Sequence, residues 1–128
     1  MAYESPLVTI GTLTAGADLS AKQYHFVVWA AATTVNVATA ITNAPIGILQ
    51  NNPESGQQAI VAISGVSKVV ADGTLAAGNC IGTSSDALAD AISPGTDTTV
   101  YMMGQCLQAA SAGETFTMFL NPSNCRAA

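Results

Sequence analysis

The sequence predicts an all-β fold, a small compact β-barrel or sandwich-like single domain with an extended N-terminal arm. Three observations support this prediction. Runs of β-branched and aromatic residues are short, turn residues separate them about every ten residues, and sequence signals for helices are weak. Many short strands with regular turns are typical of closed barrels and sandwiches. With 128 residues, the chain is long enough for one hydrophobic core and too short for two.

Eight segments carry the strand pattern, and each is bounded by Gly, Pro, Asn or Asp. In residues 24–29 the side chains alternate between two faces that are both mostly apolar, which is typical of a strand covered on both sides. In residues 66–70 the alternation is weaker, and we expect Lys68 to extend its charge to solvent. The predicted strands are residues 7–10, 24–29, 34–41, 46–50, 58–64, 66–70, 100–109 and 115–120.

Turn residues lie between these strands. Residues 51–56 form a loop in which Pro and Gly set the bend. The Asp-Gly step at residues 72–73 is a hairpin signal, and residues 111–114 should join the last two strands as a hairpin. Residues 87–92 have the composition of one helical turn, which the following Pro94 would end.

The N-terminal segment has two interpretations. Residues 1–14 are loose polar positions followed by a short strand, and residues 15–128 then form the single all-β domain. The segment is either an ordinary first strand or an arm that pairs with the sheet edge of another protein. Strand addition requires only backbone groups and alternating pockets, so the sequence leaves both alternatives open.

The composition favours an assembly and argues against two classes of partner. Hydrophobic residues make up 49% of the chain and charged residues only 9%, against about 25% in an average soluble domain. A surface so poor in charge suits a protein that hides part of it against other subunits. The net charge is −5 and the three basic residues are scattered, so we expect no direct nucleic-acid binding and no membrane association. We see no secretory signal and no spanning segment, and expect synthesis in a cytoplasm.

Catalysis is not expected, because the residues that it needs do not occur in a suitable pattern. The one histidine, His25, lies in a predicted strand as a half-buried residue, and no Gly-x-Ser-x-Gly turn occurs. Pairing of His25 with Cys80 or Cys106, as in a small hydrolase, remains an alternative without local support. Residues 78–83 lack the lysine and the spacing of a phosphate-binding loop and are expected to form a strand. We therefore predict no enzyme activity, no catalytic residue and no cofactor.

A metal site is not expected either. Asp86 and Asp90 would offer oxygens to Ca²⁺, but a calcium loop supplies many more ligands. Cys80, Cys106 and Cys125 form no Cys-x-x-Cys pair, and we interpret them as reduced thiols that pack as small apolar side chains. Cys125, near the C-terminus, is the candidate for links between chains.

Four segments share a specific order of turns and strands. Residues 45–59 carry Pro-x-Gly-hydrophobic-Leu-Gln-Asn-x-Pro, residues 61–71 carry Gly-Val-Ser-Lys-Val, and residues 75–78 read Leu-Ala-Ala-Gly. Residues 103–113 contain a Gly-x-x-Leu-x-Ala-Ala step before the last strand. In this order the segments resemble the capsid decoration (cement, or head-stabilising) proteins of tailed bacteriophages, over roughly residues 40–122.

The chain departs from the family pattern at three positions. Asn79 stands where an acidic residue is common, and Cys80 and Cys106 replace plain aliphatic or small residues. Residues 1–40 match only in general character.

The resemblance implies a structural role on the outside of a virion. It implies a β-barrel-like homotrimer at three-fold and quasi-three-fold positions of the shell, which holds neighbouring major capsid protein subunits together. Many copies that each touch several subunits would make a weak contact effective. The expected capsid-facing arm is residues 1–14. Its candidate contact residues are Tyr3, Pro6, Leu7, Val8 and Ile10.

A binding module is the alternative from a different class. A virion-displayed adhesin or glycan-binding β-domain would also be all-β and non-catalytic. Such domains stack exposed aromatic rings on sugars, whereas aromatic residues are only 5% of this chain and most lie in core-like strands.

Overall fold

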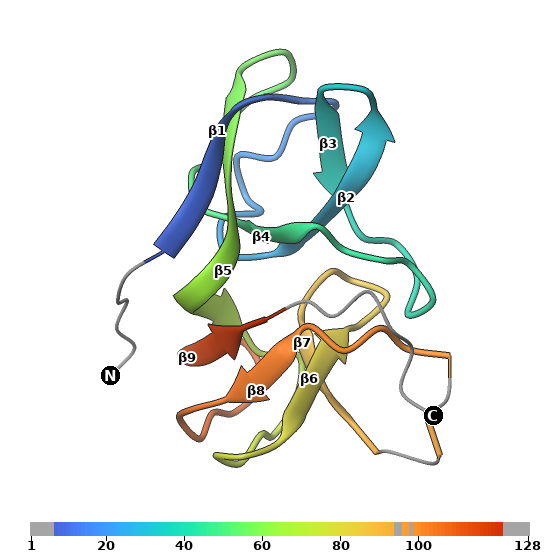
Figure 1. Cartoon of the computed structure of the whole chain (residues 1–128), viewed down its shortest axis with the longest axis vertical. Helices are drawn as coiled ribbons and strands as arrows, with labels where there is room; N and C mark the ends of the chain where they lie inside the picture. The colour runs from blue at the N-terminus through green and yellow to red at the C-terminus, as the bar shows by residue number, and fades with distance from the viewer. Residues whose placement is uncertain (1–6, 94–95, 98, 122–128) are drawn as a thin grey trace.

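The computed structural model describes residues 7–93, 96–97 and 99–121, which form nine strands (Figure 1). These residues contain no helix, and so none that is long and apolar enough to cross a membrane. The all-β prediction is confirmed. The strands are β1 (Leu7–Ala15), β2 (Phe26–Ala31), β3 (Thr34–Val37), β4 (Gly47–Leu49), β5 (Gln58–Val70), β6 (Cys80–Thr83), β7 (Ala89–Ile92), β8 (Gly104–Cys106) and β9 (Thr115–Leu120).

Five of the strands close a small barrel, which is the upper half of Figure 1. The hydrogen-bonded order β1-β3-β2-β4-β5 returns to its start because β1 also pairs with β5. The pairing of β1 with β3 is parallel and short, and it joins Thr14 to Thr34 and Ala15 to Val35. The other pairings in the ring are antiparallel. Closure of a sheet on itself removes most of its exposed strand edges.

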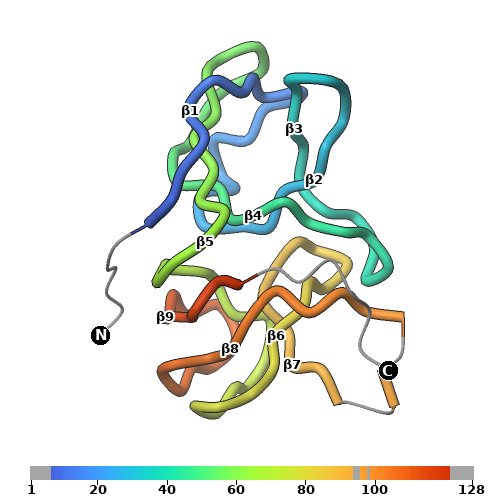
Figure 2. The backbone as a smooth tube through the Cα atoms, in the orientation of Figure 1, coloured from blue at the N-terminus to red at the C-terminus, as the bar shows by residue number. Residues whose placement is uncertain are grey.

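The lower half is a sheet that continues from the barrel through β5. Its order is β5-β9-β8-β6-β7, and all of its pairings are antiparallel. The first part of β5 pairs with β1 and β4, whereas Gly65 to Val70 pair with β9. Figure 2 shows the chain of β5 running from the barrel into this lower sheet. The two halves therefore share one strand and form a single domain.

Two main clusters of buried side chains make the core. The barrel cluster fills the interior of the closed ring and includes Leu13, Val35 and Leu49. The central cluster lies between the two halves, where Phe26 of the barrel packs in the same cluster as Met118 of the lower sheet. Fully burying one such side chain contributes about 1.5–3 kcal/mol. The two halves therefore share one cluster of buried side chains.

A bulge in β5 lets one strand serve both clusters. Val8 pairs with Ser64 and Thr9 with Ala62, which leaves Ile63 as an extra residue on β5. An extra residue reverses which face the following side chains point to. The bulge therefore changes which alternate residues of β5 face the barrel cluster and which face the central cluster. The two predicted strands 58–64 and 66–70 are wrong as separate elements, because Gly65 continues the strand.

Three predicted strands differ in their bounds from those observed. The strand expected at 24–29 begins only at Phe26, because Tyr24 has a φ of 65°, outside the strand region. The strand expected at 34–41 ends at Val37, because the side chain of Asn43 accepts the amides that follow and forms a local turn. The segment 100–109 contains only the short β8.

The turn predictions had mixed outcomes. The chain turns between Ser111 and Glu114, whose backbone groups are hydrogen-bonded at 3.1 Å, and the antiparallel neighbours β8 and β9 confirm the last hairpin. The Asp-Gly hairpin at 72–73 is wrong, since β5 and β6 are not neighbours in the sheet. The predicted helical turn at 87–92 is also wrong, because this segment leads into β7, an antiparallel partner of β6. The predicted strand within 78–83 is confirmed as β6.

Candidate functional site

The candidate contact residues that the structure describes lie on β1. Leu7, Val8 and Ile10 pair with Gly65, Ser64 and Val61 of β5, respectively. Tyr3 and Pro6 lie outside the described residues. The assignment of residues 1–14 as a capsid-facing arm stays a prediction, but residues 7–14 also form part of the barrel wall.

The side chains of three residues near the start of β1 have different surroundings. Leu7 packs against the central cluster, and Ile10 packs against the barrel cluster. Val8 lies between them and is 55% exposed. Of the candidate residues on β1, Val8 is therefore the one whose side chain is most available to a partner.

Val8 belongs to a larger apolar surface that the sequence did not predict. Its partner Ser64 is exposed, and two residues further along β5 lies Val66, whose partner on β9 is Phe119. Paired residues share a face of a sheet, as do residues two apart on one strand. Val8, Ser64, Val66 and Phe119 thus form an outer strip that crosses β1, β5 and β9. Phe119 is 43% exposed and is the largest side chain of this strip.

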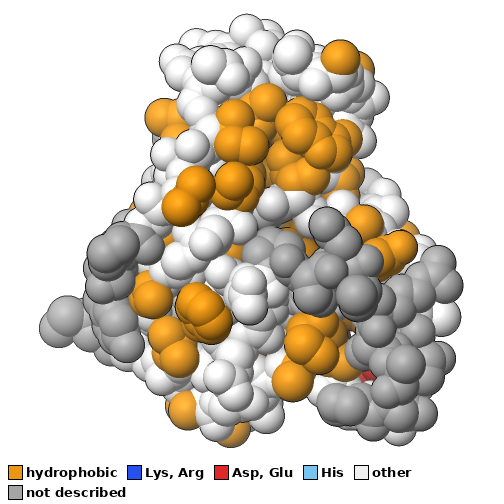
Figure 3. Space-filling view, in the orientation of Figure 1, with side chains coloured by type: hydrophobic (Ala, Val, Ile, Leu, Met, Phe, Trp, Pro, Cys, Tyr) orange, Lys and Arg blue, Asp and Glu red, His pale blue; other side chains and the backbone are white. Residues whose placement is uncertain are grey.

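The four residues of the outer strip are uncharged, and Lys68, two residues beyond Val66 on the same face of β5, places a positive charge at its end. Figure 3 shows apolar side chains at the surface over both halves of the molecule, and almost no charged side chain on the face that it draws. Contacts on such a surface depend on shape and apolar burial rather than on charge. The strip could not be found from the sequence, because only the strand register places Val8 beside β5 and Phe119 on its other side.

His25 is placed as a structural residue. It is half-buried, lies just before β2 rather than within it, and its Nδ1 is 3.1 Å from the carbonyl oxygen of Gln23. Burial lowers the pKa of His25, and the nearby positive charge of Lys22 adds to this effect against opposing backbone hydrogen bonds. Together these effects favour the neutral imidazole over its charged form.

The two described cysteines occupy different sites. Cys80 is half-buried at the start of β6, and Cys106 is buried in the central cluster. The Sγ of Cys106 donates a hydrogen bond to the carbonyl oxygen of Gln108 at 2.9 Å. Burial raises the pKa of the Cys106 thiol, which disfavours the reactive thiolate. Cys125 lies outside the described residues.

The carboxylate of Asp72 lies near two others close to β7. The pKa of Asp72 is raised by burial first and then by the negative charges of Asp90 and Asp86. In the part of the chain that the structure describes, no group of three or more His, Cys, Asp or Glu side chains is arranged to hold a metal ion. Asp90 instead accepts the backbone amide of Ala91 at 2.9 Å.

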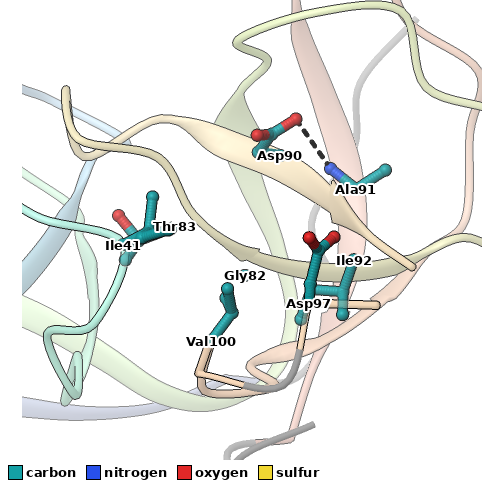
Figure 4. A pocket seen from close by; sticks show the side chains of 8 residues that line it. All are labelled: Ile41, Gly82, Thr83, Asp90, Ala91, Ile92, Asp97 and Val100. Carbon is teal, nitrogen blue, oxygen red and sulfur yellow. Dashed lines mark hydrogen bonds between the residues drawn. The ribbon is translucent and has the colours of Figure 1, made fainter. Parts of the chain in front are cut away.

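A small pocket opens between the β3–β4 loop and the lower sheet (Figure 4). Its volume is about 70 Å³, whereas pockets for small-molecule ligands measure about 300–1,000 Å³. The space is enough for about two water molecules. The pocket is lined by Ile41, Gly82, Thr83, Asp90, Ala91, Ile92, Asp97 and Val100.

Comparisons with known proteins find a shared fold. No family model matches this sequence, and no curated protein matches it. Among solved structures, the N base of the head fiber gp8.5 of bacteriophage phi29 is similar, with a TM-score of 0.66 and 16% sequence identity. The match covers 91% of this chain and 95% of that chain. At this identity the likeness shows the fold alone.

Proposed function

We propose that this chain is a non-catalytic structural protein of a phage head that attaches to the outside of the capsid. The observation that carries the proposal is the structural match to a head-fiber base over nearly the full length of both chains. The resemblance of residues 45–59 and 61–71 to capsid decoration proteins rests on local sequence and points to the same part of a virion. Two different kinds of comparison therefore agree on a phage head.

The proposed mechanism is burial of uncharged surface between this chain and the major capsid protein. Val8 and Phe119 are large apolar side chains that a partner would cover, and covering them is favoured by about 25 cal/mol for each Å² of apolar surface. We further propose that the chain acts as a homotrimer at three-fold and quasi-three-fold positions, where one trimer would touch several capsid subunits. Residues 1–14 would contribute the capsid-facing segment.

The test is co-sedimentation of the purified full chain with expanded, DNA-free heads of the phage that encodes it. We expect saturable binding and an increase in the temperature at which the heads disrupt. Light scattering of the free protein should give the mass of a trimer. A stable monomer that does not sediment with heads would overturn the proposal.

Deletion of residues 1–6 tests the contribution of the N-terminal segment. Residues 7–14 are unsuitable for deletion, because β1 closes the barrel and supplies Leu13 to its core. If the segment grips the capsid, the deletion variant should remain folded and lose head binding. Full occupancy on heads by this variant would contradict the arm model.

A glycan-binding module is the second candidate, and one observation favours it. Trp29, near the end of β2, is 49% exposed, and an exposed indole ring is a suitable platform for a sugar. Binding of the isolated protein to a glycan array, with loss of that binding in Trp29→Ala, would support this function. Head binding that persists in Trp29→Ala is expected from the structural role.

A further inference from the structure

Strand β1 has an open edge. On one side, β5 pairs with β1 along almost its whole length. On the other side, the described residues provide a partner only at Thr14 and Ala15, where β3 pairs with it. Because this pairing is parallel, β3 begins opposite Thr14 and continues past Ala15, and the described residues form no backbone ladder with this side of β1 between Leu7 and Leu13.

The backbone groups of Thr9 point to this open edge. The amide of Gln50, which follows β4, donates to the carbonyl oxygen of Ile60 at 2.7 Å. The backbone N–H and C=O groups of Ile60 therefore point towards β4. Backbone groups of successive residues in a strand point to opposite sides, so the N–H and C=O groups of Val61 point towards Ile10, the partner of Val61 on β1. Ile10 in turn faces β5, so the preceding residue, Thr9, directs its N–H and C=O away from β5.

Two other edges of the sheet are blocked by their own side chains. On β3, the amide of Val37 donates to Oδ1 of the preceding Asn36 at 2.9 Å. On the outer strand β7, the amide of Ala91 donates to Oδ1 of the preceding Asp90, also at 2.9 Å. The carbonyl oxygen of Ala89 on that strand accepts the amide of Asp72 at 2.8 Å. Natural proteins cap edges in such ways to prevent strand addition.

The same device does not occur at Thr9. The residue before it is Val8, whose apolar side chain accepts no hydrogen bond. At the two other edges, by contrast, the Asn or Asp side chain immediately before the outward amide accepts its hydrogen bond. An edge left without a cap is suited to receive a strand.

The surroundings of the open edge define the chemistry of that strand. Ile10 of β1 is only partly buried and packs against the barrel cluster. Neither β1 nor β3 contains a charged residue. A strand beside β1 with apolar side chains at alternate positions would point one set of them to the same side as Ile10, and a charged strand would lose hydration without gaining a partner.

We propose that the open edge of β1 receives an extended, uncharged segment of the major capsid protein, which adds to the sheet as a strand beside Leu7 and Thr9. This inference rests on the proposed function, since it takes the shell as the partner. It differs from a contact through the outer strip, because it uses backbone groups rather than the side chain of Val8.

Two substitutions close the edge without touching the pairing with β5. Thr9→Pro removes the outward amide, and proline is tolerated on strand edges. Val8→Asn places a carboxamide oxygen immediately before Thr9, as Asn36 is placed before Val37. The matched control for Thr9→Pro is Thr9→Val, which keeps the amide. Val8→Asn is compared with Val8→Gln, which removes the same apolar side chain but places its carboxamide one methylene further from the backbone.

The experiment measures binding of the full-chain variants to DNA-free heads, with circular dichroism to confirm folding. We expect Thr9→Pro to weaken binding about tenfold or more, as for the loss of one or two hydrogen bonds, and Thr9→Val to stay within about twofold of wild type. We expect Val8→Asn to bind about tenfold more weakly than Val8→Gln. If Thr9→Pro does not fold, the comparison of Val8→Asn with Val8→Gln carries the test.

The outcomes separate this inference from the proposed function. If wild type binds heads and both edge-closing variants bind equally well, the edge inference is overturned and the proposed function stands. If wild type does not bind heads, both fail. Equal loss of binding in Val8→Gln and Val8→Asn, with normal binding by Thr9→Pro, would show a side-chain contact instead and overturn the edge inference. If the edge-closing variants change only the mass measured by light scattering, a second copy of this chain occupies the edge and the inference is wrong.

Discussion

The backbone amide of Phe26 donates a hydrogen bond to the carbonyl oxygen of Ala87, with an N···O distance of 2.8 Å. Phe26 begins β2 in the barrel, and Ala87 lies in the loop between β6 and β7, so this bond joins the two halves of the domain. Ala87 is fully buried and has a φ of 64°, a left-handed conformation that costs a non-glycine residue about 1 kcal/mol or more. The hydroxyl of Ser84 accepts the amides of Asp86 and Leu88 and holds this turn.

Substitution Ala87→Val tests the importance of this turn. Valine is bulkier in a buried site and is strongly disfavoured at positive φ, so we expect a loss of about 3 kcal/mol in the free energy of unfolding. Ala31→Val, at an exposed position of β2, is the control and should change it by less than about 0.5 kcal/mol. Urea unfolding followed by circular dichroism measures both. Equal stabilities of the two variants would show that the turn is not strained.

Glycine is required at position 47, where β4 crosses β5. A Cβ atom on Gly47 would overlap the carbonyl oxygen of Ala62, its neighbour on β5, which is backbone and cannot move aside. We expect Gly47→Ala to cost about 3 kcal/mol or more, by separating β4 from β5 and opening the barrel. The control is Gly73→Ala, because a Cβ atom on Gly73 meets nothing within 4 Å. It should be neutral or stabilise by up to about 1 kcal/mol.

The stability of the protein should fall as the pH is lowered through the range where histidine titrates. The native state lowers the pKa of His25 below its ordinary value of 6.5, so the unfolded chain binds a proton more readily than the folded one. The contribution of neutral His25 is therefore complete above about pH 6.5 and declines below it. Urea midpoints at pH 7.5 and pH 5.5 should differ more for wild type than for His25→Gln. The same difference in both proteins would contradict this prediction.

The two described cysteines should react at very different rates. The Cys106 thiol is buried and its pKa is raised, whereas Cys80 is half-buried on the surface of the lower sheet. In a Cys125→Ser background, we expect iodoacetamide to modify Cys80 at least about tenfold faster than Cys106, because the thiolate is the reactive form. Mass spectrometry of the digested protein measures both sites. In urea the rates should converge, and equal rates in the native protein would contradict the placement of Cys106.

The local pattern predicted some elements well and others poorly. The last strand was predicted correctly, because Thr115 to Leu120 combine β-branched and aromatic residues between clear turns. Strand β7 was not predicted, because its residues, Ala89–Ile92, have low intrinsic preference for strands and are held there by pairing with β6. The Asp-Gly step at residues 72–73 wrongly predicted a hairpin, because strand pairing is also set by distant segments. A turn sequence shows that the chain bends and not which strands it joins.

The candidate site could be predicted only in part. Val8 was among the expected contact residues, but its neighbour on the outer strip, Phe119, is more than a hundred residues away in the sequence. The open edge at Thr9 could not be recognised at all without the pairing of β1. Whether a backbone amide points to a partner strand or to solvent depends on register and on bulges, which local sequence does not encode.

The sequence by itself determined that this is an all-β protein, poor in charge and without a pattern of catalytic or metal-binding residues. It did so because periodicity, turn residues and composition are local properties of the chain. Only the tertiary structure decided that five strands close a barrel, that β5 serves both halves, and that, among the described residues, β1 has no strand partner on one side between Leu7 and Leu13. These features depend on pairing between distant segments, and a single bulge at Ile63 is enough to change which side chains face the core.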